Sequence, residues 1–165
     1  MRQDTAEDRP AAAAGPDTAP VLRILTHRWQ GPALGLLLGA LAASGQAPVS
    51  WPWLALAAYA LAIGLFTLPL GWRVAAVRGW AFGTGHFAAA LFWIVEPFFV
   101  DPLRHGWMAP FALVFMAGGL ALFWGAAFGA AHALGRGQAA RAPWLAALLT
   151  GAEMLRSVVF TAFPW

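Results

Sequence analysis

Five long apolar runs, separated by short segments that carry arginine, place the tightest limit on what this chain can fold into. The hydrocarbon core of a bilayer is about 30 Å thick, and about 20 residues of helix cross it. Lipid offers no hydrogen-bond partners to open backbone groups, so each crossing must be helical. We therefore predict an all-α fold, a polytopic helical membrane bundle of about five transmembrane helices, over residues 32–47, 51–70, 79–99, 108–134 and 144–160.

Composition supports this fold class and excludes several functions. Hydrophobic residues make up 61% of the 165 residues and charged residues 10%, whereas a soluble domain carries about 25% charged residues. The sequence has no lysine, its arginines are spread along the chain, and the net charge is only +3, so no basic stripe is available for a nucleic acid. It has no cysteine, which excludes disulfides, thiolate metal sites and a cysteine nucleophile within these residues.

Residues 1–20 differ from the rest of the chain. They combine four acidic with two basic residues and contain three prolines, a composition that predicts a disordered tail. We assign residues 1–30 to a disordered cytoplasmic tail with a basic flank, and residues 31–165 to a transmembrane helical domain. The flank and the first run also resemble a secretory signal peptide, but the long acidic tail and the runs that follow favour an uncleaved first transmembrane helix.

The arginines predict the orientation of the bundle, because cytoplasmic loops carry an excess of basic residues. With a cytoplasmic N-terminus, the segments before and between the runs hold Arg104 on the outer side and six arginines on the inner side. These six are Arg23, Arg28, Arg73, Arg78, Arg136 and Arg141. We predict a multi-pass protein with a cytoplasmic N-terminus and with the segment 96–107 and Trp165 outside the cytoplasm.

Two ionisable side chains stand inside the fifth run. Glu153 and Arg156 are three residues apart and therefore share one face of a helix. Each costs about 2.5–3.5 kcal/mol at the centre of a membrane helix on insertion scales, so this helix needs its neighbours or a wet cavity. Two interpretations stay open: an internal ion pair with Arg156 reaching toward the interface, or a polar wall of a substrate cavity.

His86 is a further ionisable group, in the third run. It could relay a proton or contact a ligand, but a neutral histidine hydrogen-bonded inside the bundle is the interpretation that we favour. The sequence shows no metal-ligand cluster, phosphate loop or catalytic triad spacing, so we predict no metal and no cofactor. Glycines recur four residues apart in three runs, which predicts close helix packing, at Gly31, Gly35 and Gly39, at Gly79 and Gly83, and at Gly125 and Gly129.

The C-terminal residues carry the most specific pattern. Residues 153–156 (EMLR), followed by 159–165 (VFTAFPW), closely resemble the E-x-L-R and L-x-T-G-F-P-W segments of bacterial apolipoprotein N-acyltransferases. Residues 92–94 (FWI) and 122–125 (LFWG) resemble motifs in the third and fourth membrane helices of that family. The resemblance covers roughly residues 31–165. Ser157 and Ala162 stand where the family usually has glycine, and both are small enough to preserve close packing.

The resemblance implies the N-terminal transmembrane portion of such an enzyme, in the bacterial inner (cytoplasmic) membrane. A complete member transfers an acyl chain from a phospholipid to the N-terminal diacylglyceryl-cysteine of a lipoprotein. Its catalytic Glu, Lys and Cys lie in an extracytoplasmic nitrilase-like domain, so no catalytic residue can be assigned here, and we expect a truncated chain that is inactive alone. Membrane phospholipid and, in the complete family member, an apolipoprotein are the expected partners, with no nucleic acid. Lipid-cavity or structural polar contacts are expected at Trp93, Glu153, Arg156, Phe163, Pro164 and Trp165.

Two alternatives belong to other functional classes. The chain could be a small polytopic transporter or channel subunit that uses the intramembrane His86, Glu153 and Arg156. It could also be a lipid-binding or assembly protein without catalytic turnover. Flux that depends on Glu153 would favour the first, and stable partners without turnover would favour the second.

Overall fold

The computed structural model describes residues 19–159, and every regular element in that range is a helix. This confirms the all-α class for the described part of the chain. The predicted tail over residues 1–18, and also Phe163, Pro164 and Trp165, lie outside the described residues. The α-helices are α1 (Ala19–Thr26), α2 (Gln30–Ala42), α3 (Pro52–Phe66), α4 (Trp72–Ala90), α5 (Pro102–His105), α6 (Ala109–Leu134) and α7 (Gln138–Val159), with short 3₁₀-helices η1 (Ala43–Gly45), η2 (Phe92–Phe99) and η3 (Gly106–Met108) between them.

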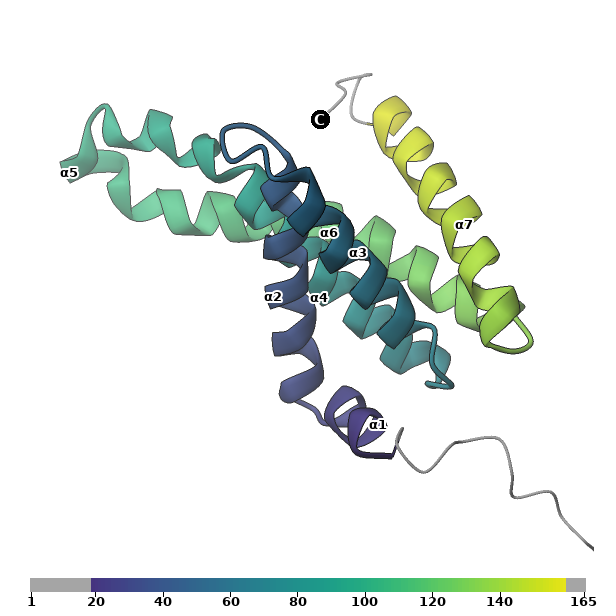
Figure 1. Ribbon diagram of the computed structural model, residues 1–165. Coiled ribbons are helices and arrows are strands. Elements are labelled where there is room, and N and C mark those ends of the chain that lie inside the picture. Colours follow the sequence, from purple (N-terminus) through teal and green to yellow (C-terminus); the bar gives the residue numbers. More distant parts are fainter. Residues whose placement is uncertain (1–18, 160–165) are drawn as a thin grey trace, which may run out of the picture.

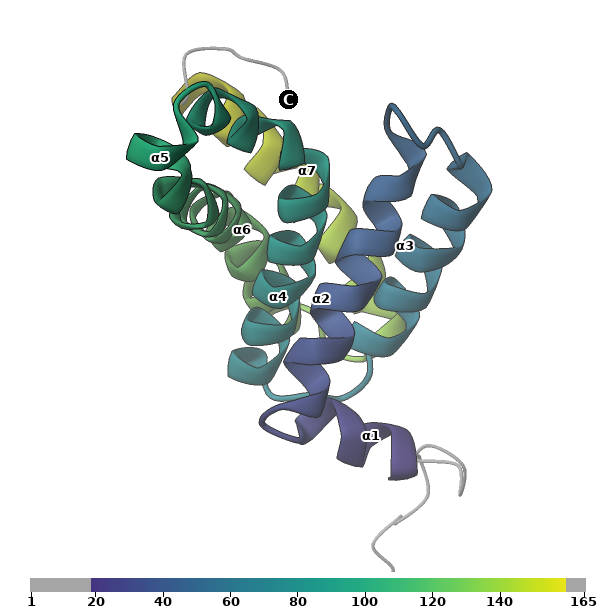
Figure 2. The ribbon, with the colours of Figure 1, turned by 90° about the vertical axis from the view of Figure 1, so that its left-hand side faces the viewer.

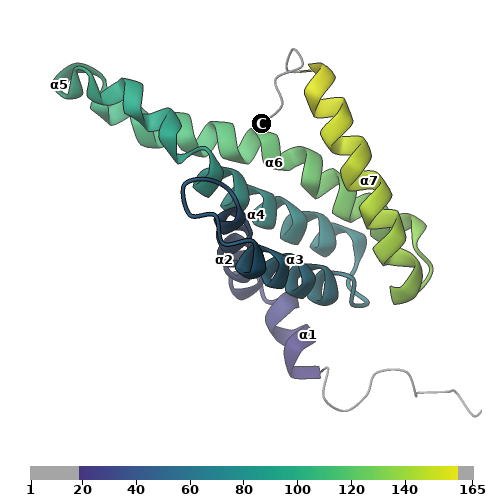
Figure 3. The same cartoon turned by 45° about the horizontal axis from the view of Figure 1, so that its top comes forward.

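Helix α4 is the centre of the arrangement (Figure 1). It packs against α2 on one side and against α6 on the other, while α3 packs on α2. In Figure 2, α6, α4, α2 and α3 follow one another from left to right. Helix α7 packs mainly against α6, and Figure 3 shows it crossing the C-terminal part of α6, whereas α5 lies beyond the opposite end. The fold is therefore a layer of packed helices with α7 added on one face.

One helical stretch in the described residues is both long and apolar enough to cross a membrane. It comprises the 33 residues Pro102–Leu134, which include α6, and α6 matches the predicted run 108–134 to within one residue. Helix α3 is apolar but has only 15 residues, and α2 has 13. The five-span arrangement thus remains a prediction.

The structure corrects the predicted loop before the third run. Helix α4 begins at Trp72 instead of residue 79 and ends at Ala90, so Arg73 and Arg78 belong to a helix. The remainder of the predicted run forms η2, which contains Pro97. A proline has no backbone N–H and clashes with the preceding turn of an α-helix, so the run divides into two elements. Arg141 is likewise helical, inside α7.

Two of these arginines, Arg78 and Arg141, donate hydrogen bonds to backbone carbonyls near the ends of other helices. Arg78 is 3% exposed and donates from Nε to the carbonyl of Leu25 at 2.7 Å and from Nη2 to that of His27 at 3.0 Å. Arg141 donates from Nη1 to the carbonyl of Thr67 at 3.0 Å. The last carbonyls of a helix have no partner within it and attract cations. Each arginine therefore caps the C-terminal end of another helix, α1 or α3.

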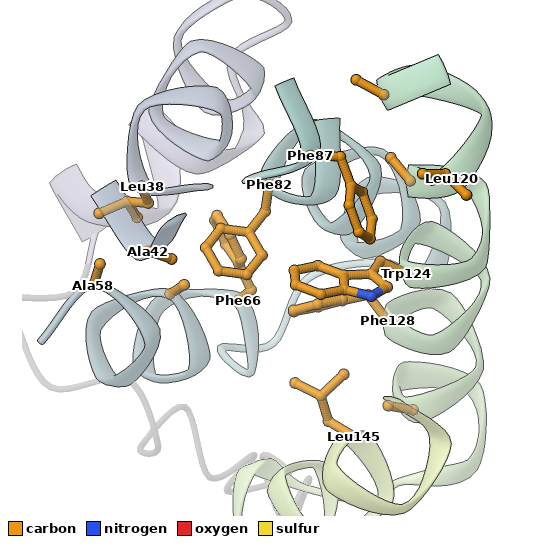
Figure 4. Packing of buried hydrophobic residues seen from close by; sticks show 14 of the residues in the cluster. Leu38, Ala42, Ala58, Phe66, Phe82, Phe87, Leu120, Trp124, Phe128 and Leu145 are labelled. Carbon is orange, nitrogen blue, oxygen red and sulfur yellow. The ribbon is translucent and has the colours of Figure 1, made fainter. Parts of the chain in front are cut away.

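Aromatic side chains fill the core between α3, α4 and α6 (Figure 4). Phe82 stacks on Trp124 with ring centroids 5.5 Å apart, and Phe66 and Phe128 meet edge to face at 5.9 Å. Such pairs contribute about 0.5–1.5 kcal/mol each beyond the burial of their area. This cluster fixes the position of Trp124, which also borders the cavity described below.

Glycines allow α2 and α4 to cross at backbone contact. A Cβ atom on Gly39 would overlap the carbonyl of Phe82, and one on Gly85 would overlap the carbonyl of Leu36. Gly39 belongs to the four-residue spacing found in the sequence, and the predicted close packing is confirmed there. Small residues at a crossing let two helix backbones approach without side chains between them.

Candidate functional site

A cavity of about 530 Å³ lies where α3, α4, α6 and α7 meet the segments η1 and η2. Its polar groups gather on α7 and around His86, and its remaining wall is aromatic and aliphatic. The lining residues are Gln46, Ala47, Tyr59, His86, Phe87, Ala90, Leu91, Trp93, Trp124, Glu153 and Arg156. The cavity therefore presents hydrogen-bonding groups beside an apolar surface.

Glu153 and Arg156 form an ion pair on α7. Arg156 donates from Nε to Glu153 Oε2 at 3.0 Å and also from Nη2 to the same oxygen. The other carboxylate oxygen, Oε1, accepts a hydrogen bond of 2.6 Å from the indole nitrogen of Trp124 on α6. The pair expected from the i,i+3 spacing is therefore present, and it is tied to a second helix.

Arg156 lines the cavity and has a further donor that is buried. Its side chain is 5% exposed, whereas Glu153 is 37% exposed. The guanidinium carbon lies 5.7 Å from the ring centroid of Phe87. Its Nη1 is buried and has no hydrogen-bond partner among residues 19–159. A buried donor without a partner costs about 1–3 kcal/mol, so a ligand oxygen at Nη1 would gain that hydrogen bond.

His86 lines the cavity beside Trp124. Its imidazole stacks on the indole with centroids 5.1 Å apart and an interplanar angle of 25°. Its Nε2 lies 3.4 Å from the amide nitrogen of Gln46, and its Nδ1 lies 3.5 Å from the hydroxyl of Tyr59. The geometry agrees with the favoured interpretation, a histidine hydrogen-bonded inside the bundle.

The remaining sequence candidates divide between the cavity and the rest of the chain. Trp93, on η2, lines the cavity, whereas residues 163–165 lie outside the described range. Sequence reasoning missed Gln46 and Tyr59 as cavity residues. Tyr59 is the only tyrosine of the chain and lies in an otherwise apolar helix, a signal that could have found it. Gln46 follows η1 and carries no comparable signal.

The chemistry available to this site is binding. Across residues 19–159, no group of three or more His, Asp or Glu side chains is arranged to hold a metal ion. The spare Nη1 is a hydrogen-bond donor, and an ester carbonyl or a phosphate oxygen can accept from it. The adjoining aromatic wall suits an acyl chain.

Known proteins resemble this chain over the range that contains the cavity residues. Residues 38–165 match the family model "Apolipoprotein N-acyltransferase N-terminal domain". The apolipoprotein N-acyltransferase of Caulobacter vibrioides is 41% identical over 152 residues, which are 87% of this chain and 27% of that protein. The corresponding protein of Rhodopseudomonas palustris is 35% identical over 148 residues, with 86% and 27% covered. No solved structure matches.

The chain thus spans about a quarter of the length of these curated relatives. All of the cavity residues fall inside the matched range.

Proposed function

Because this chain belongs to the apolipoprotein N-acyltransferase family, we propose that it forms the membrane anchor and lipid-access region of such an enzyme in the bacterial inner membrane. The complete protein would transfer an acyl chain from a phospholipid to the N-terminal diacylglyceryl-cysteine of lipoproteins. Neither cysteine nor lysine is present in these 165 residues. The thioester and oxyanion chemistry of the reaction would therefore come from a domain outside this sequence. The transporter alternative gains no support from the relatives, which carry an acyltransferase name.

In the proposed membrane arrangement α2, α3, α4 with η2, α6 and α7 each cross the bilayer. Helix α6, with 26 residues, is about 39 Å long, so it tilts or protrudes from a core of about 30 Å. Helix α2 with η1 covers residues 30–45, about 24 Å, so the bilayer thins locally or polar flanking residues reach outward. The arginine asymmetry supports a cytoplasmic N-terminus.

The absence of cysteine makes this topology directly testable. Arg104→Cys on α5 and Gln138→Cys at the start of α7 would each give the chain a single thiol. A maleimide that does not cross membranes should label Arg104→Cys in intact spheroplasts, and Gln138→Cys only after lysis. Equal labelling of the two variants in intact spheroplasts would contradict the arrangement.

Arg156 is the observation that carries the proposed lipid-access role. It lines a cavity with an aromatic wall, and its Nη1 is buried without a hydrogen-bond partner among residues 19–159, inside the range that matches the family. The cavity lies near Leu91 and Trp93, the end of α4 that the proposed topology turns away from the cytoplasm. We propose that Nη1 donates to an ester or phosphate oxygen of the acyl donor while an acyl chain lies along Trp93 and Phe87.

A chimaera tests this role in an active enzyme. Residues 38–165 would replace the matching part of the Caulobacter vibrioides relative, and the product with phospholipid and a diacylglyceryl lipopeptide would be measured. Arg156→Lys preserves the ion pair with Glu153 but removes the second guanidinium nitrogen. Loss of a hydrogen bond to a charged donor, worth about 1.5–3 kcal/mol, predicts about a 10- to 100-fold fall in kcat/KM for the phospholipid.

The control variant is Arg104→Lys, an exposed arginine on α5, which should leave kcat/KM unchanged. An Arg156→Lys chimaera as active as the parent would refute the role of Nη1. The chain of 165 residues alone should give no triacylated product, and any product from it would overturn the assignment of the chemistry to another domain.

A further inference from the structure

A second hollow lies on the opposite part of α4, in the groove between α4 and α6. It measures about 510 Å³ and is open along one side. No charged side chain lines it. Its lining residues are Trp72, Ala76, Val77, Trp80, Leu122, Gly125, Ala126, Gly129, Ala130 and Ala133.

Residue size explains why this groove is hollow. The α6 wall consists mostly of glycine and alanine, whereas α4 contributes two large side chains, Trp72 and Trp80, that are partly exposed. Trp80 is held in place by a hydrogen bond of 3.0 Å from its indole nitrogen to the carbonyl of Gly118. The lining extends over residues 72–80 of α4 and 122–133 of α6, about 12–16 Å along a helix. This length is about half of the hydrocarbon core of a bilayer.

An arginine that forms no ion pair within residues 19–159 lies at one end of the groove. The guanidinium of Arg73 lies 5.1 Å from the ring centroid of Trp72, and Trp72 is the groove residue nearest the start of α4. The acidic side chains within residues 19–159 are Glu96, Asp101 and Glu153. None of these three forms an ion pair with Arg73.

We propose that this groove binds one acyl chain of an anionic glycerophospholipid whose phosphate pairs with Arg73. The proposal rests on the membrane arrangement proposed above, which puts Arg73 at the cytoplasmic surface. The groove is about as long as one leaflet is deep, which suits an acyl chain, and Arg73 at its end can pair with an anionic headgroup. Leu91 and Trp72 lie at opposite ends of α4, so this lipid occupies the other leaflet from the cavity at Arg156. It is a bound structural lipid and not the acyl donor.

The selectivity expected of this site follows from its single cation. An arginine near an anionic membrane surface contributes about 1 kcal/mol, which corresponds to about a fivefold preference for an anionic over a zwitterionic headgroup. The apolar groove binds the acyl chain whichever headgroup is present. Removing Arg73 should therefore change the preference between anionic and zwitterionic lipids, and filling the groove should lower the amount of lipid bound.

Native mass spectrometry of the purified chain can measure both quantities. The chain would be reconstituted in a bilayer of equal amounts of phosphatidylglycerol and phosphatidylethanolamine, extracted in mild detergent, and its retained lipids counted. We expect the groove to retain one lipid per chain, in addition to any lipid in the cavity at Arg156, with phosphatidylglycerol favoured about fivefold in the groove. Arg73→Gln should remove the preference at similar occupancy. Ala133→Leu, which places a larger side chain in the groove, should lower the occupancy of the groove by phosphatidylglycerol and by phosphatidylethanolamine at least fivefold.

Matched controls separate this site from general attraction. Arg23→Gln removes an exposed arginine from α1, and Ala57→Leu enlarges an exposed residue of α3 outside the groove. Neither should change retention. The proposal is overturned if the parent chain retains no lipid, if it shows no preference, if Ala133→Leu retains as much as the parent, or if Arg23→Gln acts like Arg73→Gln.

Alkaline extraction of membranes keeps this test distinct from that of the proposed function. A chain that leaves the membrane in alkaline carbonate would contradict the membrane arrangement itself. A chain that stays in the membrane but retains no lipid contradicts only the groove proposal.

Discussion

Replacing Gly39 by alanine tests the crossing of α2 and α4, on which the positions of Gln46 and His86 depend. The added methyl group would overlap the carbonyl of Phe82 and come within 2.7 Å of the His86 backbone nitrogen. Both obstacles are backbone atoms, so no side-chain rotation can make room. The two helices must instead separate until carbon contacts return to about 3.5–4.0 Å.

Two opposing free-energy terms set the size of the effect. Alanine is favoured over glycine in a helix by about 1 kcal/mol. Overpacking of a well-packed contact costs about 1–3 kcal/mol, and backbone obstruction at this site points to the upper part of that range. The net loss of unfolding free energy is therefore about 1–2 kcal/mol. Gly64 on α3 meets nothing within 4 Å, so Gly64→Ala keeps only the favourable term.

Thermal unfolding in one detergent, followed by circular dichroism, compares the two variants. For a chain of this length, 1 kcal/mol shifts Tm by about 2–4 °C. We expect Gly39→Ala to lower Tm by about 2–8 °C and Gly64→Ala to raise it by up to about 4 °C. If the two substitutions shift Tm in the same direction, the reasoning from backbone contact is refuted.

Three further predictions concern buried polar groups. Glu153→Ala should destabilise the chain by about 2–3 kcal/mol, less than the 3–5 kcal/mol typical of a broken buried pair, because the carboxylate is partly exposed. Glu153→Gln can still accept the hydrogen bond from Trp124 and should lose less stability. The Tm of each variant measures the loss, and equal losses would contradict the role of that hydrogen bond. Arg78→Gln should release α1 from the bundle, because two hydrogen bonds worth about 1.5–3 kcal/mol each are weakened. Limited trypsin digestion within α1 should become at least about tenfold faster, and an unchanged rate of digestion would contradict the capping role. Trp80→Phe should cost about 1 kcal/mol by removing the hydrogen bond to Gly118, and a Tm equal to that of the parent would show that this bond contributes no net stability.

The sequence predicts those features that depend on neighbours along the chain. Helix α6 follows from a run of apolar residues without a central proline, and its bounds agree with the prediction within one residue. The Glu153–Arg156 pair follows from i,i+3 spacing on a helix. Gly39 follows from small residues four apart. In each case the physical cause lies within one or two turns of helix.

Features that depend on distant partners could not be predicted in this way. Arg78 resembles a loop cation near the end of an apolar run, yet its partners are carbonyls of Leu25 and His27, about fifty residues away. The cavity likewise draws Gln46 and Tyr59 from elements whose relative positions no local pattern contains. The third run was predicted as one span because apolarity alone does not distinguish an α-helix from the 3₁₀-helix that contains Pro97.

The central place of α4 also sets an order in time. Helix α2 makes most of its contacts with α4 and fewer with α3, which directly follows it in the chain. A ribosome adds about 5–20 residues per second, so roughly 2–10 s separate the synthesis of Ala42 from that of Ala90. During this interval α2 can contact α1, η1 and α3 but not α4, its main partner. The backbone contact at Gly39 can form only after α4, which carries Phe82 and His86, has been synthesised.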